Sequence, residues 1–314
     1  MATSPNLSEI ITTTLRNRSK SLADNVTNHN ALLRRLNESG NVTTVTGRQI
    51  QRELEYASNG TVAFYQGYET LNVAPSDVLT SATFDYAQLA GNITISGLEQ
   101  IQNSGTEAII NLLDSRIGVL EKTMANTLST SLYSDGTGTS GKEVGGLQLL
   151  VADAGTGTVG GINSSTFTFF QNKQTTATSS AFSTTNIQTD MNTIYLSLVR
   201  GSDSPDLIMA DTNSYKSFLG SLQAIQRVTS DRVATSGFTS VQYLNSDVIF
   251  DSACPTNKMY FLNTDYLRLE VAANRNFVPG EAKMSINQDA MVTPMFWSGQ
   301  MTCSNRALQG VIHV

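Results

Sequence analysis

The sequence predicts an α+β fold that combines an extended β-hairpin, one long helix and a mixed α/β region. Three observations predict it. Hydrophobic and polar residues alternate through much of 42–75, which is typical of β-structure. Apolar residues then recur at steps of three and four over 105–132, the pattern of an amphipathic helix. Helix-like and strand-like patterns finally alternate from 186 to 262, which indicates a mixed α/β domain.

The composition favours a folded chain with a neutral surface. Of 314 residues, 39% are hydrophobic, 15% are charged, and 113 are Asn, Gln, Ser or Thr. A disordered chain combines low hydrophobicity with high charge, so disorder throughout is excluded. No apolar run approaches the ~20 residues that span a bilayer, and the first residues lack the apolar core of a signal peptide. We therefore expect neither a membrane span nor a secretory leader.

The counts of cysteine and histidine exclude several kinds of site. Cys254 and Cys303 are the two cysteines, and His29 and His313 are the two histidines. This is too few for a disulfide scaffold or a Cys/His zinc site, and we expect two buried thiols, with a single bridge as the alternative. Nucleophile-elbow, phosphate-loop, dinucleotide-binding and zinc-protease motifs are all missing from the sequence. The sequence thus predicts no enzyme, no catalytic residue, no metal and no cofactor.

The first 52 residues are basic, whereas the rest of the chain is acidic. They carry a net charge of +4 within a total of −6. Apolar spacing predicts one helix starting at Ser4-Pro5 and a second over 28–37 that ends at Gly40. Helices this short need a surface to lie on. We expect this basic N-terminal arm to contact an acidic neighbour or nucleic acid, with a solvated helix face as the alternative. The candidate residues are Arg16, Arg18, Lys20, Arg34 and Arg35.

Two alternating runs flank Asn59-Gly60 and predict a long hairpin. Asn-Gly favours the type I′ turn, because both central residues of that turn need positive φ. A two-stranded ribbon is marginal by itself, so we expect it to rest on another surface, of its own chain or of a neighbour.

The remaining elements follow from periodicity and from glycine or proline punctuation. A glycine-rich connector is expected at 134–141, and Asp211 or Thr212 is expected to cap a helix. Trp297 is expected to lie in the core. The other expected elements are an extended segment at 83–96, a helix at 186–199, strands at 205–210, 241–250 and 258–262, and extended structure from 266 onward.

Several segments in this order resemble one known family. They are 144–147 with 157–163, then 206–215, then 248–251 followed by 259–267. Together with the arm, hairpin and long helix, they resemble the major capsid protein of tailed double-stranded DNA bacteriophages, which has the Hong Kong 97-type capsid fold. The match in element order covers nearly the whole chain.

The resemblance implies a division into parts and a structural function. It implies an N-terminal arm (1–41), an E-loop (42–75), a peripheral P-domain with a long spine helix (76–142 and 266–314) and an axial A-domain (143–265). It also implies self-assembly into hexamers and pentamers of an icosahedral virion shell, built in the host bacterial cytoplasm. The implied partners are further copies, a portal protein and packaged double-stranded DNA, with no membrane; scaffolding and decoration proteins stay open.

Some members of this family join their subunits by an isopeptide bond from an E-loop lysine. Residues 42–75 contain no lysine, the nearest being Lys20 and Lys122, so we expect a non-covalent shell. The candidate contacts with the next subunit are then Arg48, Arg52, Glu53, Glu55, Tyr65, Tyr68 and Glu69.

Three alternatives remain open at this point. An encapsulin-like bacterial nanocompartment would share the fold and enclose enzymes. An adhesin or tail component would fit the Asn, Ser and Thr content, but the long helix argues against it. An enzyme ranks last, because no catalytic constellation is present.

Overall fold

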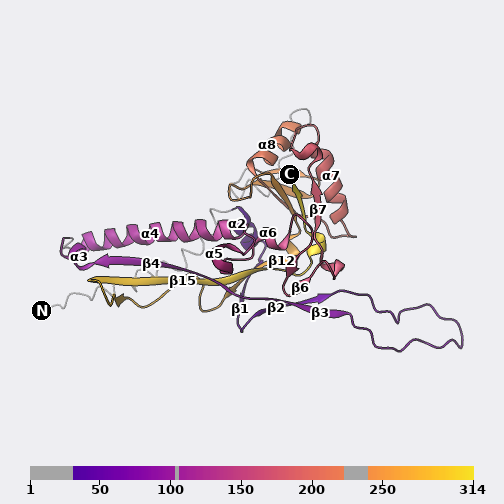
Figure 1. Ribbon diagram of the computed structural model, residues 1–314, viewed down its shortest axis with the longest axis horizontal. Coiled ribbons are helices and arrows are strands. Elements are labelled where there is room, and N and C mark those ends of the chain that lie inside the picture. The colour runs from indigo at the N-terminus through magenta and orange to yellow at the C-terminus, as the bar shows by residue number, and fades with distance from the viewer. Residues whose placement is uncertain (1–30, 103–105, 223–239) are drawn as a thin grey trace.

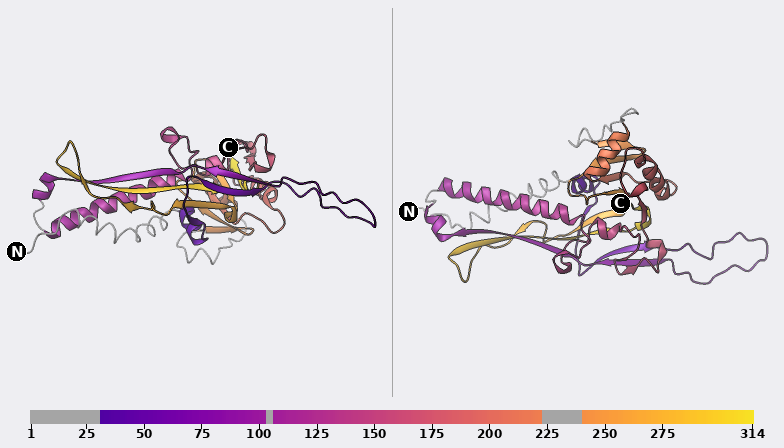
Figure 2. Two further views of the ribbon diagram at one scale, coloured as in Figure 1. Left: turned by 90° about the horizontal axis from the view of Figure 1, so that it is seen from below. Right: turned by 45° about the horizontal axis from the view of Figure 1, so that its top comes forward.

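The computed structural model describes residues 31–102, 106–222 and 240–314. An elongated body carries a compact α/β region on one side, and a thin two-stranded ribbon extends beyond it (Figure 1). The two further views show the same arrangement, with the ribbon at the end of the molecule opposite the long helix (Figure 2). None of the helices in these described ranges is both long and apolar enough to cross a membrane.

The body is built on one long strand, β15 (Ala290–Cys303). One edge of β15 pairs antiparallel with β4 over ten residues, from Ala290 opposite Ser96 to Gly299 opposite Ala87. The other edge takes three shorter strands in turn, and a further strand adds parallel to one of them. The strands of this sheet besides β15 are β1 (Val42–Val45), β4 (Ala87–Ser96), β12 (Leu267–Ala272), β13 (Val278–Pro279) and β14 (Lys283–Met284).

Helix α4 (Thr106–Ser131) lies along β4, and the short helix α3 (Gly97–Gln102) precedes it (Figure 1). The α4 side chains Ile117, Met124 and Leu128 are buried against the body. These residues belong to the helical stripe seen in the sequence, so the expected helix at 105–132 is confirmed. Trp297 of β15 is buried as expected, with 2% of its surface exposed.

The α/β region is a six-stranded mixed sheet with the order β7-β16-β11-β8-β10-β9. Its residues alternate between two cores: Ile208 and Phe261 pack under the helices, whereas Leu207 and Tyr260 pack toward the body. Both faces are therefore apolar, and β8 is buried throughout. The strands are β7 (Lys173–Thr176), β8 (Leu207–Ala210), β9 (Ser240–Tyr243), β10 (Ser246–Phe250), β11 (Lys258–Leu262) and β16 (Gly310–His313), and the helices are α7 (Ile187–Leu198) and α8 (Thr212–Ser221).

Most local expectations for this region are confirmed. Asp211 caps α8, and its carboxylate accepts hydrogen bonds from the backbone N–H groups of Asn213 and Ser214 at 3.2 and 2.9 Å. The expected single strand at 241–250 is wrong, because it folds into β9 and β10 around a turn in which Leu244 has a φ of +52°.

The link from α4 to this region contains short elements: α5 (Gly138–Gly141), α6 (Leu147–Leu150), β5 (Thr158–Val159) and β6 (Ile162–Asn163).

Helix α2 (Ala31–Glu38) packs against the body of the molecule. Leu32, Leu33 and Leu36 are buried in the main core. Arg35 is buried too, and its guanidinium pairs with the Asp247 carboxylate of β10 at 2.7 Å. The chain then leaves α2 through Gly40, at a φ of +71°, and enters β1.

Arg306 is a fully buried cation that joins three segments of the chain. It donates to the carbonyl oxygens of Leu150 and Phe170 at 2.6 and 3.1 Å, and to the side chains of Asn172 and Ser164 at 3.0 and 3.4 Å. Burial lowers the pKa of this guanidinium to about 10. Because backbone carbonyls face it in place of a carboxylate, Arg306 supplies the hydrogen bonds that two irregular loops would otherwise lack.

We expect Arg306→Ala to lower the free energy of unfolding by about 3 kcal/mol or more, because it leaves buried carbonyl oxygens unpaired and opens a cavity. Urea unfolding of the purified chain measures the change. Arg306→Lys is the matched control, since it keeps the charge with fewer donors, and it should fall between the wild type and Arg306→Ala. Equal stability of Arg306→Ala and wild type would contradict this role.

Candidate inter-subunit surface

The root of the ribbon is a short antiparallel pair of strands. β2 (Ile50–Glu55) pairs with β3 (Leu79–Phe84), with Ile50 opposite Phe84 and Glu55 opposite Leu79. This register centres the ribbon on Gly67, which has a φ of +59°. Around it, the Glu69 N–H donates to the Gln66 carbonyl oxygen at 3.4 Å.

The expected hairpin turn centred on Asn59-Gly60 is therefore wrong, although a local turn remains there, in which the Val62 N–H donates to the Asn59 carbonyl oxygen at 3.4 Å. The Asn-Gly rule is local, whereas this register is fixed by burial at the root, where Ile50, Leu54 and Phe84 enter the main core. The ribbon runs from residue 50 to residue 84, and its strands are paired at the root, 50–55 with 79–84. The expected start of the hairpin at Val42 is also wrong, because β1 pairs with β12 of the body.

The root is held by close packing as well as by pairing. The Thr83 N–H donates to the Gly160 carbonyl oxygen at 3.0 Å. Gly160 has a φ of +58°, and a Cβ there would lie 2.7 Å from the Cβ of Ala82, so only glycine allows this approach. On the other arm the rings of Tyr56 and Phe169 stack with their centroids 5.4 Å apart.

Arg52 on β2 forms an ion pair with its own chain. Its guanidinium contacts the carboxylate of Glu270 on β12, and that glutamate is 2% exposed. The Thr302 hydroxyl donates to the same carboxylate at 3.2 Å. A buried carboxylate is costly without a cation beside it, so the fold is stabilised only when both partners are in place. The pair therefore holds the ribbon against the body sheet. Arg52 is accordingly part of the ribbon's anchor.

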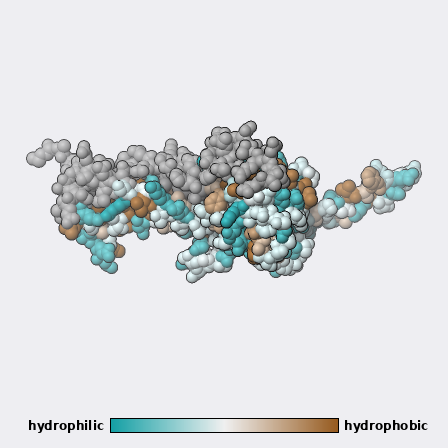
Figure 3. All heavy atoms as spheres, turned by 90° about the horizontal axis from the view of Figure 1, so that it is seen from above, coloured by the Kyte–Doolittle hydropathy of each residue, from teal (hydrophilic) through white to brown (hydrophobic). Residues whose placement is uncertain are grey.

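Beyond residue 56 the large side chains of the ribbon are mostly exposed among the described residues. Phe64 and Tyr68 are as exposed as in an extended peptide, at 108% and 107%. Figure 3 shows the ribbon standing clear of the body with apolar side chains along it. The exposed apolar residues of this ribbon tip, defined as 57–78, are Val62, Phe64, Tyr65, Tyr68, Leu71 and Val73. Such a group of large side chains marks a contact surface.

The ribbon is also acidic. The sequence contains no lysine or arginine between Arg52 and Arg116, whereas Glu53, Glu55, Glu69 and Asp77 lie along the exposed ribbon. A surface that covers the tip should therefore be apolar in its centre and neutral or basic at its edge.

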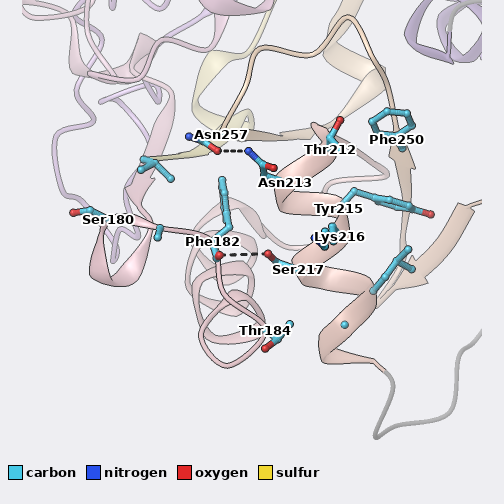
Figure 4. A pocket seen from close by; sticks show the side chains of 14 residues that line it. Ser180, Phe182, Thr184, Thr212, Asn213, Tyr215, Lys216, Ser217, Phe250 and Asn257 are labelled. Atoms are coloured by element: carbon cyan, nitrogen blue, oxygen red, sulfur yellow. Dashed lines mark hydrogen bonds between the residues drawn. The ribbon is translucent and has the colours of Figure 1, made fainter.

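A separate pocket of about 790 Å³ opens beside α8 in the α/β region. The loop carrying Ser180, Phe182 and Thr184 faces this helix across it, and hydrogen bonds join Asn213 to Asn257 and Ser217 to the Phe182 carbonyl at 2.9 and 3.3 Å (Figure 4). Among the described residues of its lining, Lys216 is the one charged side chain.

Metal and thiol chemistry find no support in the described ranges. No group of three or more potential metal ligands occurs there. Cys254 and Cys303 are free and buried, which confirms the expectation of two thiols. Burial raises the pKa of the Cys303 thiol to about 12 and that of Cys254 still further, so neither is a nucleophile near neutral pH.

Comparison with known proteins identifies the fold by structure and not by sequence. No protein-family model matches the sequence, and no curated protein matches it. The capsid of cyanophage A-1(L) superposes with a TM-score of 0.67 at 15% identity, covering 87% of this chain and 90% of that one. The procapsid of satellite phage P4 gives 0.55 at 10% identity over 94% and 97% of the two chains. This is the Hong Kong 97-type capsid fold.

An encapsulin shares this capsid fold. The holo-SrpI encapsulin complex of Synechococcus elongatus PCC 7942 has a TM-score of 0.58 at 8% identity, covering 88% of this chain and 86% of that one. Phage capsid proteins predominate among the similar structures.

The structure places the residues proposed from sequence in three different settings. Tyr65, Tyr68 and Glu69 lie together at the exposed tip, while Glu53, Glu55 and Arg48 are exposed near the root, away from them. Arg35 forms a buried ion pair, Arg52 is partly exposed and pairs with the buried Glu270, and Arg34 pairs with Glu38 at 2.8 Å. Arg16, Arg18 and Lys20 lie outside the described residues. Sequence reasoning omitted Val62, Phe64, Leu71 and Val73 as contacts, although their alternation was visible.

We expect Arg52→Ala to lower the free energy of unfolding by about 2 kcal/mol, less than for a fully buried pair because Arg52 is partly exposed. The cost arises because the buried Glu270 is left without its cation. Urea unfolding measures it. In the double variant Arg52→Ala/Glu270→Gln much of the loss should be recovered, since no buried charge remains. A double variant less stable than Arg52→Ala would contradict the pairing.

Proposed function

We propose that this chain is the major capsid protein of a tailed double-stranded DNA phage, and that its copies form hexameric and pentameric capsomers of an icosahedral shell. The observation that carries the proposal is the ribbon tip, which exposes six large apolar side chains. The shared fold of phage capsid proteins supports the same conclusion.

The tip supplies a strong reason for association. Burying one large apolar side chain contributes ~1.5–3 kcal/mol, so the six at the tip provide on the order of 10 kcal/mol before the entropic cost of ordering the ribbon. In a closed shell each copy gives one ribbon and receives one. A single ribbon contact is therefore repeated over the whole lattice.

The parts of the chain take the following roles in this proposal. The ribbon is the E-loop, α4 with the β15 sheet is the P-domain, and the α/β region is the A-domain. The residues before α2 form an arm whose basic groups meet a neighbour or the packaged DNA. A portal protein occupies one vertex, and the protein acts without a catalytic site or cofactor in the virion, after assembly in the host cytoplasm.

A nanocompartment shell is the second candidate, because an encapsulin shares the fold at similar coverage. The two functions differ in what they enclose. Electron microscopy of the expressed chain should show closed icosahedral particles for both. Particles from infected or induced host cells that hold double-stranded DNA support the phage capsid, whereas particles filled with an enzyme overturn it in favour of the nanocompartment. A chain that stays monomeric under assembly conditions contradicts both.

We expect Phe64→Asp combined with Tyr68→Asp to abolish particle formation, because two desolvated carboxylates would have to enter an apolar contact. The stability of the isolated chain should not change, since neither side chain packs against it. Sedimentation and electron microscopy measure assembly, and thermal unfolding measures stability. Gln66→Asp is the control for added charge alone and should retain particles. Wild-type yields from the double variant would contradict the role of the tip.

We expect the particles to dissociate fully into monomers when boiled in detergent. The E-loop between residues 50 and 84 has no lysine, so the amine needed for an isopeptide bond to a neighbour is missing from it. Denaturing gel electrophoresis of purified particles is the measurement. A ladder of subunit multimers that resists boiling and reductant would show that another residue forms a covalent link.

A further inference from the structure

The Asn59-Gly60 pair lies in the exposed part of the ribbon, outside the paired strands, in a local turn in which the Val62 N–H donates to the Asn59 carbonyl oxygen at 3.4 Å. Both residues are exposed, and no atom of the described residues other than 59–61 lies within 4 Å of the position that a Gly60 Cβ would occupy. The pair is therefore free to do chemistry that a paired strand would prevent.

The Asn59 carboxamide is held in an unusual way by the residue two positions later. Its Oδ1 atom accepts hydrogen bonds from the Thr61 backbone N–H at 2.9 Å and from the Thr61 hydroxyl at 2.7 Å. This is an Asx-turn with a second donor. Two donors on one carbonyl oxygen polarise the Cγ–Oδ1 bond, and they stabilise the negative charge that develops on Oδ1 when a nucleophile adds to Cγ.

A nucleophile is available in the next residue. Within the described ranges the Gly60 backbone N–H donates no hydrogen bond, so its nitrogen is not committed to any acceptor. Glycine also offers the widest range of backbone angles, which lets its nitrogen approach the preceding side chain.

We propose that Asn59 is a self-modification site, at which the Gly60 nitrogen adds to Asn59 Cγ and closes a succinimide ring. One C–N bond forms and the Cγ–Nδ2 bond breaks; the proton from the Gly60 nitrogen leaves with the Nδ2 group as ammonia. Water then opens either carbonyl of the ring and gives aspartate or isoaspartate. Solvent water is the co-reactant, and nothing is oxidised or reduced.

Asn163 provides an internal comparison with the same turn but without the free nucleophile. Its Oδ1 accepts from the Ser165 N–H at 2.9 Å. Ser164, however, is fully buried, and its N–H donates to the Gly157 carbonyl oxygen at 3.0 Å. The nitrogen that would attack is thus both occupied and fixed.

Asp135 provides the second comparison, because Thr137 donates to its carboxylate from N–H and hydroxyl at 2.9 and 2.7 Å, as Thr61 does to Asn59. Here the hydrogen bonds from Thr137 hold the pKa of the carboxyl below its usual value, so it stays ionised and is a poor electrophile. The Gly136 N–H also donates to the Ser134 hydroxyl at 3.1 Å. Asn59 differs from Asp135 by its neutral amide, and from both sites because the N–H of the following residue donates no hydrogen bond within the described ranges.

Conversion adds a negative charge beside Val62 and Phe64 of the tip, and isoaspartate also lengthens the backbone. The following step rests on the proposed function. A neighbour that covers the ribbon restrains the chain and excludes water, so we expect Asn59 to survive in assembled particles and to convert in free chains. Chains that stay unassembled for a long time would then carry more aspartate or isoaspartate at position 59 than chains in particles.

Incubation of the full-length free chain near neutral and at mildly alkaline pH tests the modification. Cleavage after glutamate releases residues 56–69, in which Asn59 is the sole asparagine, and tryptic cleavage releases residues 143–173 with Asn163. Mass spectrometry and an isoaspartate assay follow both. We expect steady conversion of Asn59, faster at higher pH, while Asn163 stays an amide. Equal rates at the two asparagines would overturn the proposal.

Two variants separate the structural argument from the Asn-Gly sequence alone. Gly60→Ala fits the open space and should slow conversion several-fold. Thr61→Val keeps the shape but removes the hydroxyl donor, and it should also slow conversion measurably. A wild-type rate in Thr61→Val would refute the role of Thr61.

Assembled particles give the last comparison. Slower conversion in particles than in free chains supports protection by a neighbour, and equal rates count against it. If Asn59 converts but no particles form, the modification stands and the proposed function fails.

Discussion

Strand β15 is the constraint on which the rest of the structure depends. It pairs with β4 on one edge and with β14, β13 and β12 in turn on the other, so it sets the register of four strands at once. A slip of one residue would turn buried side chains such as Trp297 and Met301 toward solvent. Because β12 carries both β1 and Glu270, the end of the arm and the ribbon's ion pair also take their positions from β15.

Buried polar contacts then join parts of the chain that are distant in sequence. Arg35 reaches Asp247, Arg52 reaches Glu270, and the Tyr133 hydroxyl donates to Asp251 at 2.9 Å, which links the end of α4 to the α/β sheet. Each group is costly to bury without its partner, so these contacts favour one arrangement of arm, body and α/β region over others. For the ribbon, the polar contacts with the body lie at its root.

The sequence predicts the elements whose signals are local and misses those whose partners are distant. Helix α4, the Asp211 cap of α8 and the buried strand β8 each follow from spacing or composition within one segment. Val42–Val45 has the right period, but periodicity does not reveal that β12 is its partner. Asn59-Gly60 is a strong turn signal overruled by burial of the ribbon root. Arg52 became a candidate for a contact with the next subunit because of its charge. Nothing near it in the sequence reveals that its carboxylate partner is Glu270 of the same chain.

An exposed apolar ribbon can aggregate with other ribbons, and its negative charges oppose this aggregation. Two-stranded ribbons leave unpaired backbone at both edges, which invites strand addition by any other chain. Glu53, Glu55, Glu69 and Asp77 place like charges along every copy, so two ribbons repel each other when they meet side by side. Because the tip repels other copies of itself but has an apolar centre, it should bind a different surface. This charge pattern therefore disfavours aggregation of ribbon onto ribbon, as the proposed shell would require.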